Sequence, residues 1–272
     1  LYVPVAWGRK TGIVAHDLRS GDRLWRFETA PVVTGILMAD DQLIFSDEES
    51  TVYGVTISGE ERWALALDDQ AAVTSSPVRV TEDVVAVADD RGRVHGLEVQ
   101  RGSVRWQTVL EEPTYSSLAS SGGVVVASTT RGTVYALEGS TGEVLWRYEG
   151  PDARVKYATA AIADAGVVVG GSDGILKLLA VDTGTERWSW QASGAITAAP
   201  VVTANHVIVG TMSASVHAIE LSTGTEVWNA RVRGRIKSAP TVAGGAVYLV
   251  GEPRYLYRFS PQEEEKELTH ND

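Results

Sequence analysis

Tryptophan recurs along this chain at a nearly constant interval. Six tryptophans are separated by 38, 43, 40, 42 and 40 residues, and each follows a glycine by four positions. They are Trp25, Trp63, Trp106, Trp146, Trp188 and Trp228. A period of this length is typical of repeat proteins, in which each unit packs against the next. We therefore expect the 272 residues to form a single domain of repeats.

Each repeat contains four short segments of small and β-branched residues, separated by Gly, Asp and Ser. In the fourth repeat, for example, residues 124–127 and 134–138 are two such segments. Helical periodicity is not convincing in any segment, so the chain is predicted to be all-β. One four-stranded unit of about 40 residues cannot cover both of its own faces, whereas a ring of such units can. The sequence therefore predicts a β-propeller with four-stranded antiparallel blades.

Seven blades are predicted within the single domain of residues 1–272. Six inner strands are centred on Leu37, Pro77, Leu118, Ala160, Pro200 and Pro240. The first blade lacks an inner strand, and a parent protein with eight blades is the alternative. The predicted blades are 1–29 (partial), 30–69, 70–110, 111–150, 151–192, 193–231 and 232–272. We expect the acidic residues 261–272 to form a frayed outer strand, and the chain to be a piece of a longer product.

The turn before each tryptophan resembles the tryptophan-docking motif of the pyrroloquinoline-quinone-like propeller repeats, Ala-x-Asp-x-x-Thr-Gly-x-x-x-Trp. The fourth repeat matches it with Ala136, Glu138, Thr141, Gly142 and Trp146. The first and sixth repeats match similarly, the second, third and fifth more loosely, and the seventh never reaches a tryptophan. We expect each tryptophan ring to lie between neighbouring blades and to cover a turn glycine, which is a structural role.

Composition excludes several classes of function. The chain has no cysteine, which excludes disulfides, zinc-thiolate sites and thiol nucleophiles. Its net charge of −11 argues against binding to nucleic acid or an anionic membrane. No apolar run approaches the ~20 residues of a transmembrane helix. Quinoprotein dehydrogenases of the resembled family commonly place an adjacent-cysteine disulfide beside their cofactor, so we expect no cofactor here.

Neither the histidines nor the acidic pairs form a predicted catalytic or metal site. His16, His95 and His217 lie in the third strands of three different repeats, too far apart to converge. The acidic pairs are in predicted loops, where they are usually solvated, and none has the spacing of a calcium loop. We therefore expect no catalytic residue and no bound metal.

Charged loop residues are divided between two halves of one predicted face. In blades two to four the loops are acidic, with Asp47, Glu48, Glu49, Asp68, Asp69, Asp89, Asp90, Glu111 and Glu112. In blades five to seven they carry Arg154, Lys156, Arg231, Arg233, Arg235 and Lys237, with Asp173 as an acidic exception. The alternate cations of residues 231–237 would all point to one side of an extended strand. They are interpreted either as a solvated edge paired with neighbouring carboxylates or as a recognition site for an acidic peptide or anionic group.

A ring of polar side chains is predicted at the entrance to the central funnel. It consists of Thr34, Thr74, Tyr115, Tyr157, Thr197 and Lys237. Such a ring would hold either a small polar ligand or only ordered water.

The leading hypothesis is a non-enzymatic, monomeric scaffold that binds a partner protein or a small anionic ligand through one loop face. The chain is similar in this respect to the propeller lipoproteins of the bacterial outer-membrane barrel-assembly machinery. The alternatives are a fragment of a quinone-dependent dehydrogenase and the extracellular sensor propeller of a membrane kinase. By resemblance, all three imply a location outside the cytoplasm: periplasmic, secreted or surface-anchored.

Overall fold

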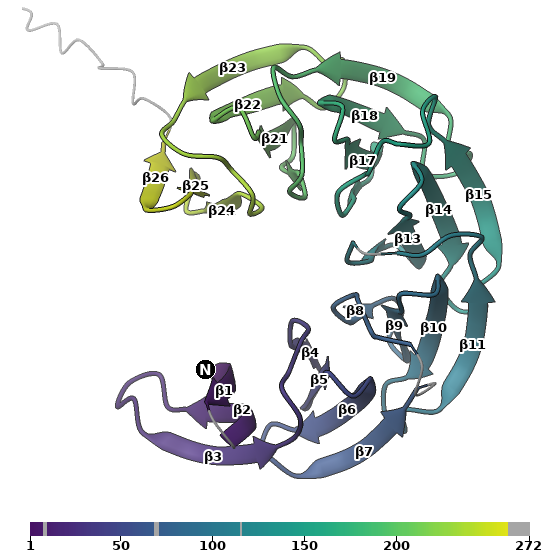
Figure 1. Ribbon diagram of the computed structural model, residues 1–272, viewed down its shortest axis with the longest axis vertical. Helices are drawn as coiled ribbons and strands as arrows, with labels where there is room; N and C mark the ends of the chain where they lie inside the picture. Colours follow the sequence, from purple (N-terminus) through teal and green to yellow (C-terminus); the bar gives the residue numbers. More distant parts are fainter. Residues whose placement is uncertain (8–9, 68–70, 115, 261–272) are drawn as a thin grey trace, which may run out of the picture.

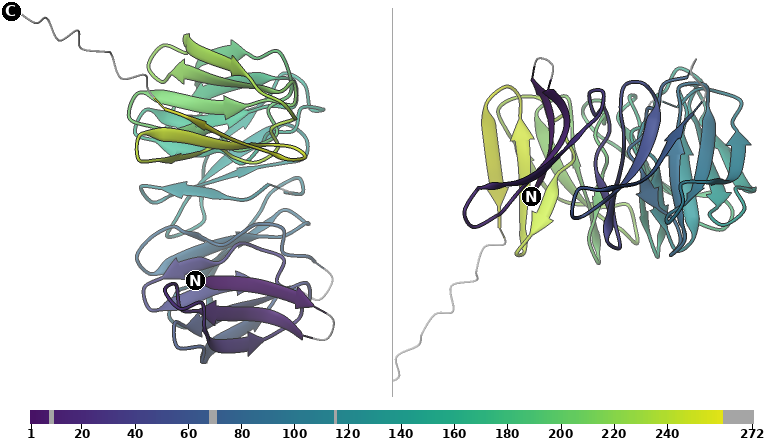
Figure 2. Two further views of the ribbon diagram at one scale, coloured as in Figure 1. Left: turned by 90° about the vertical axis from the view of Figure 1, so that its left-hand side faces the viewer. Right: turned by 90° about the horizontal axis from the view of Figure 1, so that it is seen from below.

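Seven antiparallel sheets follow one another along the chain and stand side by side in an open arc (Figure 1). The structure is a computed structural model, and it describes residues 1–7, 10–67, 71–114 and 116–260. Views from the edge show that neighbouring sheets stand next to one another all along the arc (Figure 2). The predicted all-β propeller architecture of seven sheets is confirmed.

The strands occur in chain order from the inside of each sheet to the outside. The first sheet contains β1 (Tyr2–Trp7), β2 (Lys10–His16) and β3 (Arg23–Glu28). The second contains β4 (Leu37–Ala39), β5 (Gln42–Ser46), β6 (Thr51–Thr56) and β7 (Glu61–Ala66), and the third β8 (Val78–Arg79), β9 (Val84–Ala88), β10 (Arg93–Glu98) and β11 (Val104–Val109). The fourth contains β12 (Ala119–Ser121), β13 (Val124–Ser128), β14 (Thr133–Glu138) and β15 (Val144–Glu149), and the fifth β16 (Ala161–Ala163), β17 (Gly166–Gly170), β18 (Ile175–Leu179) and β19 (Glu186–Gln191). The sixth contains β20 (Val201–Val202), β21 (His206–Gly210), β22 (Ser215–Glu220) and β23 (Glu226–Arg231), and the seventh β24 (Thr241–Ala243), β25 (Ala246–Gly251) and β26 (Tyr255–Phe259).

The burial of each strand follows its place in the sheet. Every residue of β5, β9 and β17 is buried, because a second strand is covered by a neighbouring sheet on both faces. The outer strand β11 alternates instead, with Trp106 buried between exposed neighbours. This difference explains why the second strands are continuous apolar runs whereas the outer strands are half polar.

The inner strands are short and begin later than predicted. Pro77 and Pro200 were expected at strand centres, but β8 and β20 start one residue after them. Proline has no N–H to donate to a neighbouring strand, so it lies at the start of a strand or outside it. Of the six predicted centres, only Leu37 lies within its inner strand.

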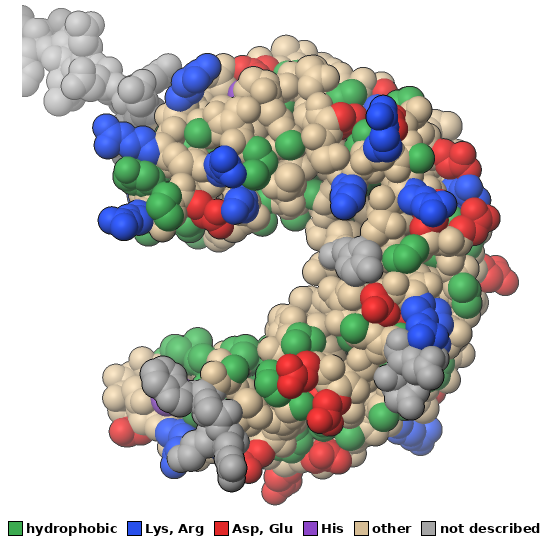
Figure 3. Space-filling model, viewed as in Figure 1, with side chains coloured by type: hydrophobic (Ala, Val, Ile, Leu, Met, Phe, Trp, Pro, Cys, Tyr) green, Lys and Arg blue, Asp and Glu red, His purple; other side chains and the backbone are tan. Residues whose placement is uncertain are grey.

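The two end sheets are incomplete in different ways. The first sheet, β1–β2–β3, lacks the inner strand, as predicted. Among the described residues, the last sheet, β24–β25–β26, has no outer strand. The predicted outer strand of residues 261–272 lies outside the described residues. The two end sheets do not meet, and the space-filling view shows the opening between them (Figure 3).

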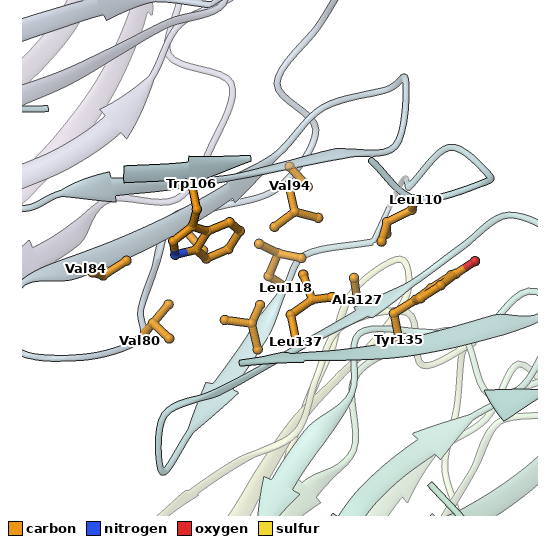
Figure 4. Packing of buried hydrophobic residues seen from close by; sticks show 12 residues of the cluster. Val80, Val84, Val94, Trp106, Leu110, Leu118, Ala127, Tyr135 and Leu137 are labelled. Atoms are coloured by element: carbon orange, nitrogen blue, oxygen red, sulfur yellow. The ribbon is translucent and has the colours of Figure 1, made fainter. Parts of the chain in front are cut away.

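Tryptophans of the outer strands join consecutive sheets. The Trp106 ring lies among Val80, Leu118 and Leu137 at the boundary of the third and fourth sheets (Figure 4). Its Nε1–H donates to the Gly139 carbonyl at 2.9 Å. Trp25, Trp63, Trp146 and Trp188 make the corresponding bonds to Ile57, Val99, Val181 and Leu221, at 2.7–2.9 Å. In each case the ring also lies against a turn glycine of the following sheet.

Trp228 is the exception in this series. It lies on β23, next to the sheet that has no described outer strand, and it is 37% exposed. Its ring contacts Phe259 edge-on at 5.1 Å between centroids, and its Nε1–H has no acceptor among the described residues. An apolar groove of about 810 Å³ lies beside it, lined in part by Val227, Val247 and Ile208. The groove marks the position that a turn fills between the other sheets.

Candidate functional site

The loops that join consecutive sheets and the turns between second and third strands meet on one face, called the loop face below. Backbone hydrogen bonds connect the two sets, for example from Ser172 N to Lys156 O and from Met212 N to Ala195 O, both at 2.9 Å. Figure 3 looks onto this face. Cationic side chains are frequent over its upper part and acidic ones over its lower part (Figure 3).

Two of the predicted acidic residues do not belong to the surface of this face. Asp47 and Asp89 are 1% and 0% exposed. Asp89 Oδ1 accepts hydrogen bonds from the backbone of Arg91 and Arg93, and Oδ2 accepts from the Arg93 guanidinium at 2.6 Å. Asp47 holds its own turn in the same way. The prediction that Asp47 and Asp89 contribute to the acidic half of the face is therefore wrong. Each carboxylate instead closes the turn that contains it.

Other acidic residues of this half are engaged as well. Glu111 forms an ion pair with Arg147 at 2.9 Å, and Glu112 accepts hydrogen bonds from the hydroxyls of Thr129 and Thr133. Glu48 and Glu49 are exposed. The predicted acidic residues Asp68 and Asp69 lie outside the described residues.

The cations of the opposite half fall into two groups. Arg154 is paired with Asp152, and Lys237 with Glu252, both at 2.7 Å. Within the described part of the chain, Lys156, Arg231, Arg233 and Arg235 form no ion pair. The interpretation of residues 231–237 as an edge neutralised by neighbouring carboxylates therefore applies to Lys237 and not to the three arginines.

Residues 231–237 alternate in exposure, but they do not form one extended strand as the prediction assumed. Arg231, Arg233 and Arg235 are exposed, whereas Ile236 is fully buried and Val232 packs with it against the core of the last two sheets. The strand itself ends at Arg231, and Gly234 has a φ of +88°. The cations are exposed, while the packing of Val232 and Ile236 anchors two of the three residues that lie between them.

The predicted ring at the funnel entrance is not a single site. Thr34 Oγ1 accepts from Ser46 N at 2.9 Å, and the Thr74 hydroxyl donates to Thr114 O at 2.9 Å, so both are engaged within the fold. Tyr157 is 4% exposed and packs between two sheets, where burial raises its pKa. Tyr157 is therefore mostly covered by the fold, and whether it contacts a ligand stays a prediction. Tyr115 lies outside the described residues.

A polar pocket of about 440 Å³ lies where the fourth and fifth sheets meet on the loop face. Most of the residues that line it lie in loops and strand ends of these two sheets. One residue, Thr197, comes from the loop between the fifth and sixth sheets. The lining residues are Ser116, Ser117, Ser128, Thr129, Thr130, Lys156, Tyr157, Ala158, Thr159 and Thr197. Of the predicted site residues, Lys156, Tyr157 and Thr197 are brought together here. The serines and threonines of blade four were not predicted, although their density in residues 116–130 was a visible signal.

Buried polar side chains between the sheets form a separate set. Lys177 is 4% exposed and its Nζ donates to Glu186 at 2.7 Å, and Tyr148 donates to the same carboxylate at 3.1 Å. Lys177 occupies the repeat position of His95 and His217, which also contact carboxylates. The sequence interpretation overlooked Lys177, although the repeat register would have identified it. These groups connect neighbouring strands and do not line the polar pocket.

No group of three or more His, Asp or Glu residues suited to a metal ion occurs among the described residues. Nor does the described part of the chain contain a helix long and apolar enough to cross a membrane.

The fold and its loop face define a β-propeller of four-stranded repeats. Sequence comparison with protein families matches residues 9–194 and 172–266 to the family described as outer membrane protein assembly factor BamB, and the chain belongs to this family. A comparison with curated protein sequences found no match.

Similar solved structures show the same fold. BamB from Moraxella catarrhalis aligns with a TM-score of 0.57 and 16% identity, over 92% of this chain and 93% of that one. The computationally designed Ika8 protein aligns with a TM-score of 0.81 and 17% identity, over 93% of this chain and 78% of that one. The C-terminal WD40 domain of Sif2 aligns with a TM-score of 0.77 and 14% identity, over 94% and 77%.

Proposed function

We propose that this chain is a non-catalytic scaffold that binds an acidic segment of a partner protein through Arg231, Arg233 and Arg235. The observation that carries the proposal is their exposure without a carboxylate partner in the described part of the chain, while nearby Lys237 is paired. A guanidinium can hold a carboxylate through two parallel hydrogen bonds. Three exposed cations within the five residues 231–235 can meet several carboxylates of one acidic segment.

Membership of the BamB family supports an interaction role, since the family description is that of an assembly factor. The same description links that factor to the assembly of outer membrane proteins, and we infer that this chain works outside the cytoplasm. The acidic lower part of the loop face would favour one orientation of a charged partner, because like charges repel.

A pull-down with matched variants tests the scaffold proposal. The test variant combines Arg231→Glu, Arg233→Glu and Arg235→Glu. The control variant makes the same change in net charge at three other exposed arginines, Arg19, Arg23 and Arg101. We expect the test variant to lose partners that the wild type and the control variant retain. Equal retention by all three proteins would show that the arginines are not the binding site.

A quinone-dependent dehydrogenase is the competing function. Titration with pyrroloquinoline quinone and calcium, followed by absorbance and by dye-coupled oxidation of alcohols and sugars, separates the two. Tight quinone binding with turnover would replace the scaffold proposal.

A further inference from the structure

The polar pocket between the fourth and fifth sheets combines one cation with several hydroxyl groups. We propose that it binds a small ligand through a carboxylate or phosphate group, held by Lys156 and by the hydroxyls of Ser117, Thr130 and Thr159. This site is distinct from Arg231, Arg233 and Arg235, and it takes a small ion instead of a protein segment. Its volume of about 440 Å³ lies in the range of small-molecule sites.

Four of the seven serine and threonine hydroxyls of this pocket are available for a ligand, whereas those of Ser116, Ser128 and Thr129 donate within the fold. Ser117, Thr130, Thr159 and Thr197 donate no side-chain hydrogen bond to any residue that the structure describes. The hydroxyls of Thr34 and Thr74, at the repeat position of Thr197, are engaged within the fold. A serine or threonine hydroxyl can rotate to point its hydrogen at an acceptor. The pocket therefore offers several donors in one small volume.

The charge of Lys156 is also available. The described residues place no carboxylate within ion-pair distance of its ammonium group. Acidic side chains in the neighbouring loops are already engaged: Asp152 by Arg154, and Glu112 by Thr129 and Thr133. Asp173 accepts the backbone N–H of Ile175 within its own turn. An arriving anion would thus meet an ammonium group that no described carboxylate pairs, while Glu112 and Asp173, which accept hydrogen bonds only from neutral groups, keep their negative charge nearby.

These features select an oxyanion as the ligand. A lysine ammonium group has three donors and no acceptor, so it requires an acceptor from the ligand. Hydrogen bonds from an ammonium group to a carboxylate or phosphate are about twice as strong as neutral ones. Carboxylate and phosphate oxygens can accept several hydrogen bonds at once, which matches a lysine surrounded by hydroxyls.

Isothermal titration at low salt tests the site, with inorganic phosphate and succinate as separate probes. We expect saturable one-to-one binding of at least one probe, and the tighter probe identifies the oxyanion class. Lys156→Ala should weaken binding at least about tenfold. Arg154→Ala is the matched control, because it removes one positive charge from the same loop but leaves the pocket intact, and it should change affinity less than about twofold. Thr159→Val keeps the side-chain shape, removes one donor and should weaken binding by about threefold to tenfold.

Three results would overturn the proposal. The first is no saturable binding of either probe at millimolar concentration. The second is an equal loss of affinity in the Lys156 and Arg154 variants, since this would indicate a general effect of surface charge. The third is unchanged affinity in both the Lys156 and the Thr159 variants. The triple arginine variant should bind the probes like the wild type, so a failure of this site and a failure of the scaffold proposal are distinguishable.

Discussion

The unequal environments of two tryptophans predict unequal effects of the same substitution. Trp106 is 8% exposed and donates its Nε1–H to Gly139, whereas Trp228 is 37% exposed and has no acceptor among the described residues. We expect Trp106→Ala to reduce the free energy of unfolding by about 4 kcal/mol, within the range for a buried tryptophan. Trp228→Ala should cost only about 1 kcal/mol.

The size of this difference follows from buried area and one hydrogen bond. A tryptophan buries up to ~250 Å², so the difference in exposure corresponds to roughly 70 Å² of surface. At ~25 cal/mol/Å² this is about 2 kcal/mol, and the hydrogen bond adds about 1 kcal/mol. A gap of about 3 kcal/mol between the two variants is therefore expected.

Urea unfolding followed by far-ultraviolet circular dichroism measures both variants against the wild type. Trp106→Phe serves as a control, because it keeps an aromatic ring and removes only the N–H donor and part of the area. It should fall between the wild type and Trp106→Ala. Equal losses for Trp106→Ala and Trp228→Ala would refute the argument that contact with the following sheet stabilises the arc.

Two further predictions concern a buried carboxylate and a turn glycine. Burial opposes the ionisation of Asp89, but hydrogen bonds from groups including Arg93 outweigh it and lower its pKa to about 2. The resulting stabilisation, roughly 2 kcal/mol, is present above the ordinary pKa near 3.8 and is lost as the pH falls toward 2. Urea unfolding should therefore show that the loss of unfolding free energy caused by Asp89→Asn shrinks between pH 6 and pH 2. A loss that stays constant over this range would contradict the prediction. Gly142→Ala should cost about 3 kcal/mol, because φ is +76° and a Cβ would overlap the Trp106 ring. Gly122→Ala, with φ of +58° and open space around it, should cost about 1 kcal/mol, and similar melting temperatures for the two variants would contradict the packing argument.

The candidate binding residues were harder to predict than the fold. Arg231, Arg233 and Arg235 were found from their alternate spacing, and their exposure agrees with it. Lys237, which continues the same pattern, is instead paired with Glu252 of the turn between β25 and β26. Tyr157 aligns with threonines that lie near the surface, but its larger ring is buried between two sheets.

The sequence by itself determined the repeat, the all-β class and the incomplete first sheet. These properties depend on local patterns: the tryptophan period, the β-branched runs and the turn residues between them. Only the tertiary structure decided which loop charges are available, since pairing depends on distances between residues of different strands and repeats. It buried Asp47 and Asp89 in their own turns, paired Arg154 and left Lys156 beside unpaired hydroxyls. Each side chain's environment depends on the neighbouring turn or sheet, and the linear spacing of residues does not encode it.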